Sequence, residues 1–198
     1  MPLPSLKEQQ AQLRKTYILD AAQEILREQG FVDMNMDDLA SHVGTSKATL
    51  YKHFASKDDL VLNVVIRVME QVEHLIGTLE TLDPPSPAAD KIKSIIMQGL
   101  ERQAWLATAR LSALPSSVRE DSRFQKHQRR LKALLTALVD TAKEEGDVAK
   151  EHPTRLIVQL IISFFDPAFH AFGEEGRSPA ASGDALTNIL FKGIEVRS

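Results

Sequence analysis

The spacing of the apolar residues restricts this chain to a helical fold. Ile18, Ala21, Ala22 and Ile25 recur at the i, i+3, i+4, i+7 positions that make up one face of an α-helix. Strict alternation of apolar and polar residues, which marks a half-buried strand, is hard to find anywhere in the sequence. The periodicity therefore predicts an all-α protein.

Capping residues divide the first part of the chain into four helices. Ser5 and Glu8 are spaced to form a capping box at the start of the first helix, and Gly30 can take a left-handed conformation at its end. Three further helices begin after residues that commonly cap N-termini, namely Asn35, Ser46 and Ser56. The four helices are expected at Leu6–Gln29, Met36–Val43, Ser46–Phe54 and Ser56–Thr81.

Prolines in the segment Leu82–Asp90 separate these helices from the rest of the chain. The remaining apolar periodicity predicts further helices, so that we expect about nine in all. The later helices are expected at residues 87–103, 104–114, 121–145, 153–172 and 183–195. We expect two domains, at residues 1–55 and 56–198.

The composition excludes several classes of protein. The chain has 198 residues and no cysteine, so a disulfide framework and a cysteine nucleophile are excluded. Its longest uncharged apolar stretch, Leu156–Phe165, is too short to span a bilayer. We therefore expect a cytoplasmic protein without a membrane partner, and no pattern indicates a cofactor. A formal net charge of −3 argues against a protein that coats DNA by charge alone.

Two short helices joined at Gly44 predict a helix-turn-helix, whose second helix is narrow enough to enter the major groove of B-DNA. In this arrangement Leu50 and Phe54 face the interior. No acidic residue occurs from Leu39 to Lys57, although residues 1–57 carry seven basic and seven acidic residues. The charges are therefore segregated, with cations at the second helix.

The outward residues of this second helix combine cations, hydroxyl groups and an aromatic ring, a mixture suited to phosphate oxygens and base edges. They are Lys47, Ala48, Thr49, Tyr51, Lys52 and His53. In an arbitrary pair of helices, an ordinary solvated face explains such a set more often than DNA binding does. These residue types by themselves leave both interpretations open.

A longer pattern favours DNA binding. The run "ILDAAQEILREQGFVDMNMDDLASHVGTSKATLYKHFASKDDL", Ile18–Leu60, resembles the N-terminal domain of the TetR family of bacterial transcriptional regulators over more than forty consecutive residues. The matching positions include Ala21-Ala22, Gly30-Phe31, Gly44, Ser46 to Tyr51, His53-Phe54 and Lys57. The resemblance implies an N-terminal three-helix DNA-binding domain, a C-terminal helical bundle for ligand binding and dimerisation, and no enzymatic activity.

The resemblance also implies which residues contact DNA. The positions are Thr45, Ser46, Lys47, Ala48, Thr49, Tyr51, Lys52, His53 and Lys57. Lys47 and Ala48 lie at the start of the recognition helix, where base contacts concentrate. Thr49, Tyr51 and His53 match positions that usually bind phosphate. This division predicts that specificity and general affinity depend on different residues.

Lys57 matches a lysine that holds the DNA backbone in the family. Other positions have a second interpretation or depart from the family pattern. Ser46 is also needed as a helix cap, and Thr45 stands where the family commonly has valine. Lys52 stands where the family often has an aromatic residue. A lysine favours a contact with phosphate or guanine, so we expect an operator unlike those of relatives. His53 is equally well explained as a packing residue between helices.

The family also implies a homodimer. The segment Leu156–Phe165 is apolar on every side, which predicts a helix buried all round, in part against another subunit. Leu186, Ile189, Leu190 and Ile194 form a second apolar stripe near the C-terminus. In the family, the last two helices of each subunit pair with their symmetry mates. A two-fold dimer reads an inverted-repeat operator on double-stranded DNA.

A ligand pocket is implied in the second domain. We expect it between parts of Ile92–Leu114 and the face Phe124–Val139, with Trp105 and Phe165 as wall residues. For each aromatic residue, simple core packing is the alternative. A small-molecule inducer bound there would release the protein, most simply a repressor, from DNA. The basic run Arg119–Lys132 is either a solvated face or a site that attracts an anionic inducer.

Two other classes of function find less support in the sequence. An enzyme requires a constellation of reactive residues, whereas the six histidines are scattered without metal-ligand spacing. Asp166 and His170 lie four residues apart in an apolar helix, but Pro167 between them favours a kink with a local hydrogen bond. A helical module that binds only protein would leave the cations of the recognition helix unexplained.

Overall fold

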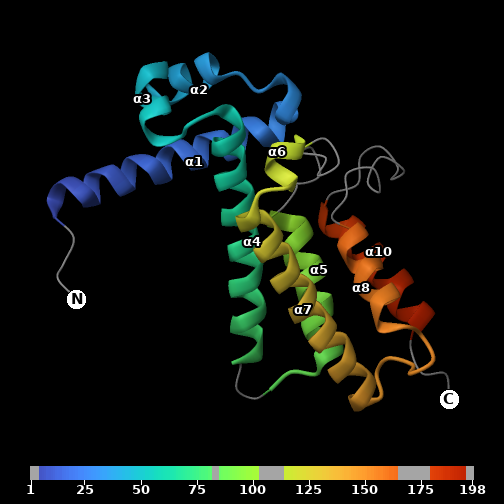
Figure 1. Cartoon of the computed structure of the whole chain (residues 1–198). Coiled ribbons are helices and arrows are strands. Elements are labelled where there is room, and N and C mark those ends of the chain that lie inside the picture. The colour runs from blue at the N-terminus through green and yellow to red at the C-terminus, as the bar shows by residue number, and fades with distance from the viewer. Residues whose placement is uncertain (1–4, 82–84, 103–113, 165–178, 195–198) are drawn as a thin grey trace.

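The computed structural model describes residues 5–81, 85–102, 114–164 and 179–194 (Figure 1). Every regular element in these ranges is an α-helix, which confirms the all-α prediction. The chain forms an N-terminal helix-turn-helix domain and a C-terminal helical domain, and one long helix runs from the first into the second (Figure 1).

The N-terminal domain contains three helices and the beginning of the long one. They are α1 (Leu6–Asp33), α2 (Met36–Val43), α3 (Lys47–His53) and α4 (Lys57–Glu80). The predicted caps are present. The side chains of Asn35, Ser46 and Ser56 each accept a backbone N–H in the first turn of the helix that follows. Gly44 ends α2 with φ 69° and ψ 37°, a left-handed conformation that glycine adopts without steric cost.

The two ends of α1 differ in how they match the prediction. At the start, the Ser5 hydroxyl accepts the Glu8 amide while the Glu8 carboxylate accepts the Ser5 amide, as in the expected capping box. At the other end, Gly30 has φ 77° but ψ 177°, so the expected left-handed stop does not form. One further helical turn, 31–33, follows this kink, because the Met34 N–H donates to the Gly30 carbonyl at 3.3 Å.

The C-terminal domain is built from α4 and five further described helices. They are α5 (Ala88–Arg102), α6 (Ser116–Arg119), α7 (Ser122–Glu145), α8 (Thr154–Ser163) and α10 (Pro179–Ile194). Helix α6 was not predicted, because four residues are too few to show a hydrophobic period. Helix α10 begins four residues before the predicted start. Almost all of the helix expected at 104–114, and the end of the one expected at 153–172, lie outside the described residues.

Two apolar cores meet along α4. The upper core joins α1, α2, α3 and the first half of α4 to the region of α6, with Leu50 and Phe54 buried as predicted. The lower core joins the second half of α4 to α5, α7, α8 and α10. Because α4 supplies Val68 to the upper core and Ile76 to the lower one, a displacement of this helix affects both domains.

In the single chain the apolar segment of α8 is buried on one side only, and the burial of its other side against another subunit stays a prediction. Ile157, Val158 and Ile161 are buried in the lower core, but Leu156 and Leu160 remain 54% and 38% exposed. The stripe on α10 is divided in the same way, because Leu190 is buried whereas Ile189 is 70% exposed.

Candidate nucleic-acid interface

Helix α3 presents its polar face outward because its apolar face is fixed in the upper core. Leu50 is fully buried, and Phe54, which ends the helix, is 1% exposed. Lys47, Ala48, Tyr51 and Lys52 of α3 and Ser46 before it are exposed, and Thr45, Thr49, His53 and Lys57 are half-buried. All nine residues predicted to contact DNA therefore lie on α3 or directly beside it.

Ser46 is occupied as a helix cap. Its hydroxyl accepts the Thr49 N–H at 3.2 Å and lies 2.8 Å from the Thr49 hydroxyl. Since a hydroxyl offers one donor and two acceptor sites, this pair keeps limited capacity for a phosphate oxygen. The geometry thus favours the capping interpretation of Ser46 that the sequence left open.

Lys47 forms an ion pair that the sequence did not indicate. Its Nζ lies 2.7 Å from Oδ2 of Asp37, in the first turn of α2, and this hydrogen bond raises the pKa of Lys47. Asp37 is ten residues away along the chain and lies outside the acid-free run Leu39–Lys57. The close approach of α2 to α3 brings the two charges together.

Lys57 is held against the end of α1. Its ammonium lies 4.4 Å from the centroid of the Phe31 ring, within range of a cation–π interaction. It also donates to the Val32 carbonyl at 3.4 Å. Partial burial at this place lowers the pKa of Lys57. The extra turn of α1 after Gly30 provides both contacts.

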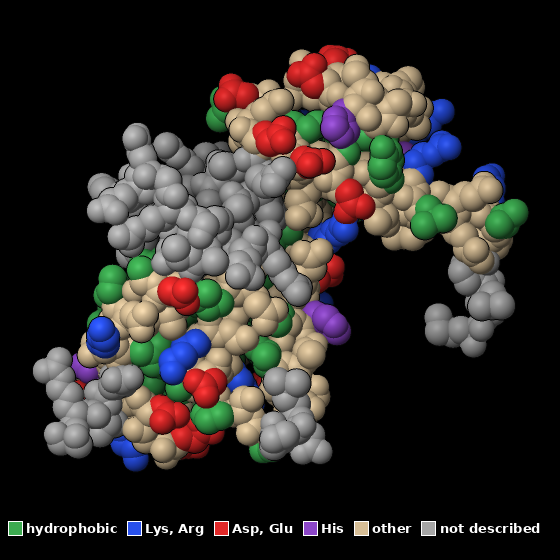
Figure 2. Space-filling model, turned by 180° about the vertical axis from the view of Figure 1, so that it is seen from behind, with side chains coloured by type: hydrophobic (Ala, Val, Ile, Leu, Met, Phe, Trp, Pro, Cys, Tyr) green, Lys and Arg blue, Asp and Glu red, His purple; other side chains and the backbone are tan. Residues whose placement is uncertain are grey.

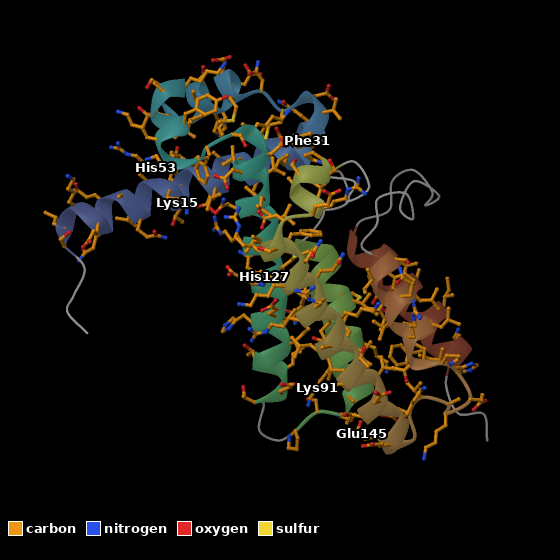
Figure 3. All side chains as sticks on the ribbon, in the orientation of Figure 1. Lys15, Phe31, His53, Lys91, His127 and Glu145 are labelled. Carbon is orange, nitrogen blue, oxygen red and sulfur yellow. The ribbon has the colours of Figure 1, made fainter. Side chains whose placement is uncertain are left out.

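His53 lies at the junction of α1 and α3, where Figure 3 also shows Lys15. The His53 and Phe54 ring centroids are 6.4 Å apart, and the Lys15 ammonium is 5.7 Å from the Phe54 ring. Sequence reasoning missed Lys15, because it is distant along the chain from α3 and belongs to no local pattern. The fold adds this cation to the edge of the predicted interface.

Charge is segregated over the N-terminal domain as the sequence indicated. Viewed from behind, Lys and Arg side chains gather at the outer edge of the domain, on the side from which α1 projects (Figure 2). Asp and Glu side chains lie over the top and the inner side (Figure 2). A polyanion would therefore approach the outer edge most favourably.

A cavity of about 350 Å³ lies in the C-terminal domain, between α4, α5 and α7. Its walls include the faces of α5 and α7 expected from the sequence, and α4 adds a wall that was not expected. The described lining residues are Val65, Val68, Met69, Val72, Leu75, Ile95, Gly99, Arg119, Phe124, Gln128, Leu131, Lys132, Leu135 and Ile162. Trp105 and Phe165, the two predicted wall residues, lie outside the described residues.

Helix α6 connects this cavity to the DNA-reading end. Arg119 of α6 lines the cavity, while the Ser117 hydroxyl of the same helix donates to Asp58 in the first turn of α4. Arg123, at the start of α7, lies 3.4 Å from Asp59. These contacts join the region beside the cavity to the residues that follow Lys57.

Other kinds of site find no support in the described part of the chain. Within it, no group of three His, Cys, Asp or Glu side chains is placed to hold a metal ion. None of its helices is both long and apolar enough to cross a membrane. Asp166 and His170 lie outside the described residues.

Comparisons with known proteins agree with this geometry. Residues 18–64 match the model of bacterial regulatory proteins of the tetR family. YvaF of Bacillus subtilis strain 168, an uncharacterized HTH-type transcriptional regulator, is 27% identical over 203 aligned residues, which cover 89% of this chain and 93% of that protein.

Two solved structures have the same fold. A TetR-family regulator from Agrobacterium tumefaciens superposes with a TM-score of 0.75 at 22% identity, over 93% of this chain and 99% of its own. FadR from Bacillus subtilis, solved with stearoyl-CoA, superposes with a TM-score of 0.72 at 18% identity, over 91% of this chain and 99% of its own. Residues 18–64 therefore form a helix-turn-helix domain of the tetR family of bacterial regulatory proteins, and the chain has the fold of TetR-family regulators over nearly its whole length.

Proposed function

We propose that this regulator is a repressor that binds an inverted-repeat operator as a homodimer and leaves it when a small molecule binds. The observation that carries the proposal is the polar face of α3, which is exposed beside a buried apolar face in a domain whose cations gather at one edge. A helix of this kind fits the major groove. A dimer bound to its operator excludes other proteins from the same DNA.

The proposed contacts divide into base and phosphate contacts. Lys47 and Ala48 are exposed at the start of α3 and read base edges, once Lys47 exchanges its partner Asp37 for DNA. Tyr51 and Lys52 are exposed on the next turn and hold the phosphate backbone. The remaining predicted positions support these contacts from the flanks and are Thr45, Ser46, Thr49, His53 and Lys57.

The proposed dimer forms through the outer faces of α8 and α10. Leu156 and Leu160 on α8 and Ile189 on α10 are large apolar side chains left exposed in the single chain. Burial of a leucine or isoleucine side chain contributes about 1.5–3 kcal/mol. Two recognition helices then reach successive major grooves about 34–36 Å apart.

The proposed release depends on α4. The cavity is lined by five residues of α4, and the first turn of the same helix lies beside α3 and is bonded to α6. A ligand that binds better to one position of α4 shifts the population toward that position. We place the boundary between the reading domain and the ligand domain near residue 55, immediately before this helix.

Selection of bound sequences from a random duplex pool tests the proposal. Wild type is expected to recover an inverted repeat. Lys47→Ala is expected to change the preference at one symmetric pair of positions, and Tyr51→Phe to weaken binding at unchanged preference. Lys150→Ala, which removes a charge from an exposed position far along the chain, is the control. If no sequence is enriched at any salt concentration, the proposal is wrong and the alternative, a helical module that binds only protein, is favoured.

A further inference from the structure

We infer that the ligand of this cavity is a single-chain amphiphile with one anionic head group, whose head binds Arg119. The inference deepens the proposed function, since it assumes that the cavity is the ligand site. It rests on the shape of the cavity, on the chemistry of its walls and on the sign of the charges beside it.

The cavity is elongated along α4 and α7. Its lining on α4 extends from Val65 to Leu75, and its lining on α7 from Phe124 to Leu135. At a rise of 1.5 Å per residue, each of these faces is about 15–17 Å long. An extended hydrocarbon chain can contact apolar side chains over this whole length, whereas a compact ring system covers only part of it.

The walls are apolar apart from one side. Among the described lining residues, the polar side chains are Arg119, Gln128 and Lys132, all of which come from α6 or α7. The α4 and α5 walls offer only Val, Leu, Ile, Met and Gly. A ligand with polar groups along its whole length would leave most of them without a hydrogen bond, at a cost of about 1–3 kcal/mol each. One polar end is therefore accommodated, and a polar body is not.

The charge at the polar side is positive. No Asp or Glu occurs among the described lining residues, so no described carboxylate in the wall would oppose an anion or bind a cation. The carboxylate of Glu73 on α4 is held by His127 at 2.9 Å and by Arg130 at 3.2 Å. Within the described residues, Arg119 and Lys132 form no ion pair. Both are therefore available to an anionic group.

Arg119 is the better candidate for the head group. It precedes α7 and lies at the end of the cavity marked by Phe124, whereas Lys132 lies about 12 Å beyond Phe124 by the helical rise. One head group can thus reach only one of them. A guanidinium offers a planar pair of donors that matches a carboxylate or phosphate, which an ammonium does not.

Calorimetric titration of the full-length protein tests the head group. The probes are sodium decanoate and decyltrimethylammonium bromide, each below its micelle concentration, and decan-1-ol below its solubility limit. Wild type is expected to bind decanoate about tenfold more tightly than decanol, because a charged hydrogen bond replaces a neutral one. Arg119→Gln is expected to lose this preference. Arg129→Gln, which removes the same charge from a residue of α7 that is exposed like Arg119 but does not line the cavity, is expected to keep it.

Three outcomes would overturn the assignment of the head group. They are equal binding of decanol and decanoate, tighter binding of the cationic probe, and loss of the preference in Lys132→Gln rather than Arg119→Gln. Decanoyl-CoA distinguishes the two sources of an anionic head. If it binds more tightly than decanoate and the difference vanishes in Arg119→Gln, the head is a phosphate of the coenzyme; otherwise it is a free carboxylate.

A series of carboxylates from six to fourteen carbons tests the shape. Affinity is expected to rise about fourfold for each added CH₂ until the cavity is filled, and then to level off. A compact polycyclic carboxylate of similar apolar area that binds more tightly than any chain would overturn the inference.

Operator binding, measured separately, distinguishes this inference from the proposed function. If no hydrocarbon-chain probe binds but the protein still recovers an inverted repeat, the proposed ligand class is wrong, whereas the proposed function as a DNA-binding regulator is supported. If decanoate binds through Arg119 without weakening operator binding, the ligand class stands and the release mechanism is wrong.

Discussion

The imidazole Nδ1 of His127 lies 2.9 Å from Oε1 of Glu73, which joins α7 to α4 beside the cavity. Glu73 is 8% exposed, and its second oxygen lies 3.2 Å from Nε of Arg130. Figure 3 shows His127 between the two helices. A buried carboxylate with two partners fixes α4 against α7 at about its middle.

Glu73→Gln is expected to lower the free energy of unfolding by about 1–3 kcal/mol, because a charge-assisted pair is lost in a mostly buried place. Glu70→Gln is the matched control. Glu70 is exposed and 3.8 Å from His127, so its substitution should change stability by less than about 0.5 kcal/mol. Urea unfolding followed by circular dichroism measures both. Equal losses in the two variants would contradict a specific role for Glu73.

Asp37→Asn is expected to strengthen operator binding about threefold. In wild type Lys47 must leave its 2.7 Å ion pair with Asp37 before it can contact a base edge, and the substitution removes this competing partner. Asp38→Asn removes the same charge from the next residue without freeing Lys47, so it should strengthen binding less. Fluorescence anisotropy with the selected operator measures both affinities. Equal gains in the two variants would contradict a role for the ion pair.

Lys57 and Phe31 should be energetically coupled. Their separation of 4.4 Å predicts a coupling free energy of about 0.5–1 kcal/mol in a double-mutant cycle of Lys57→Met, Phe31→Leu and the double variant. Urea unfolding of the four proteins measures it. A coupling near zero would mean that the two side chains are neighbours without a stabilising interaction. Lys57→Met should also weaken DNA binding equally for all sequences, if Lys57 contacts phosphate.

Asp121 should contribute to the acid sensitivity of the fold. Hydrogen bonds from Arg123 lower the pKa of Asp121 below its ordinary value of 3.8. Since the unfolded chain then binds more protons, the contribution of Asp121 to stability is fully present above pH 3.8 and is lost as pH falls through the lowered pKa. Asp121→Asn keeps a good cap for α7 but cannot titrate. Its urea midpoint should lie below that of wild type at pH 5, and the difference should narrow at pH 3.

The exposed apolar residues of α8 and α10 should control the oligomeric state. Ile189→Glu and Leu160→Glu are each expected to convert a dimer to a monomer in sedimentation velocity, because a charge cannot be buried unpaired in an apolar interface. Leu13→Glu changes a leucine on α1 that is as exposed as Ile189, and it should leave the dimer intact. Dissociation by Leu13→Glu instead would place the interface at the N-terminal helix.

The local elements of the N-terminal domain could be predicted because each depends on residues close together in sequence. The caps Asn35, Ser46 and Ser56 act within three residues, and the left-handed Gly44 acts at its own position. The inward direction of Leu50 follows from helical spacing. The nine predicted DNA contacts remain a prediction, although the structure places all of them in one region.

The sequence by itself determined where the helices of the N-terminal domain begin, which face of α3 is apolar and that cations concentrate on its other face, because capping and periodicity are local properties of the chain. Tertiary structure alone decided that Asp37 pairs with Lys47, that Lys57 lies over Phe31 and that Glu73 joins α4 to α7. It also decided that α4 forms a wall of the cavity and that only one side of α8 is buried. These relationships depend on how helices pack against one another, and no local spacing encodes that packing.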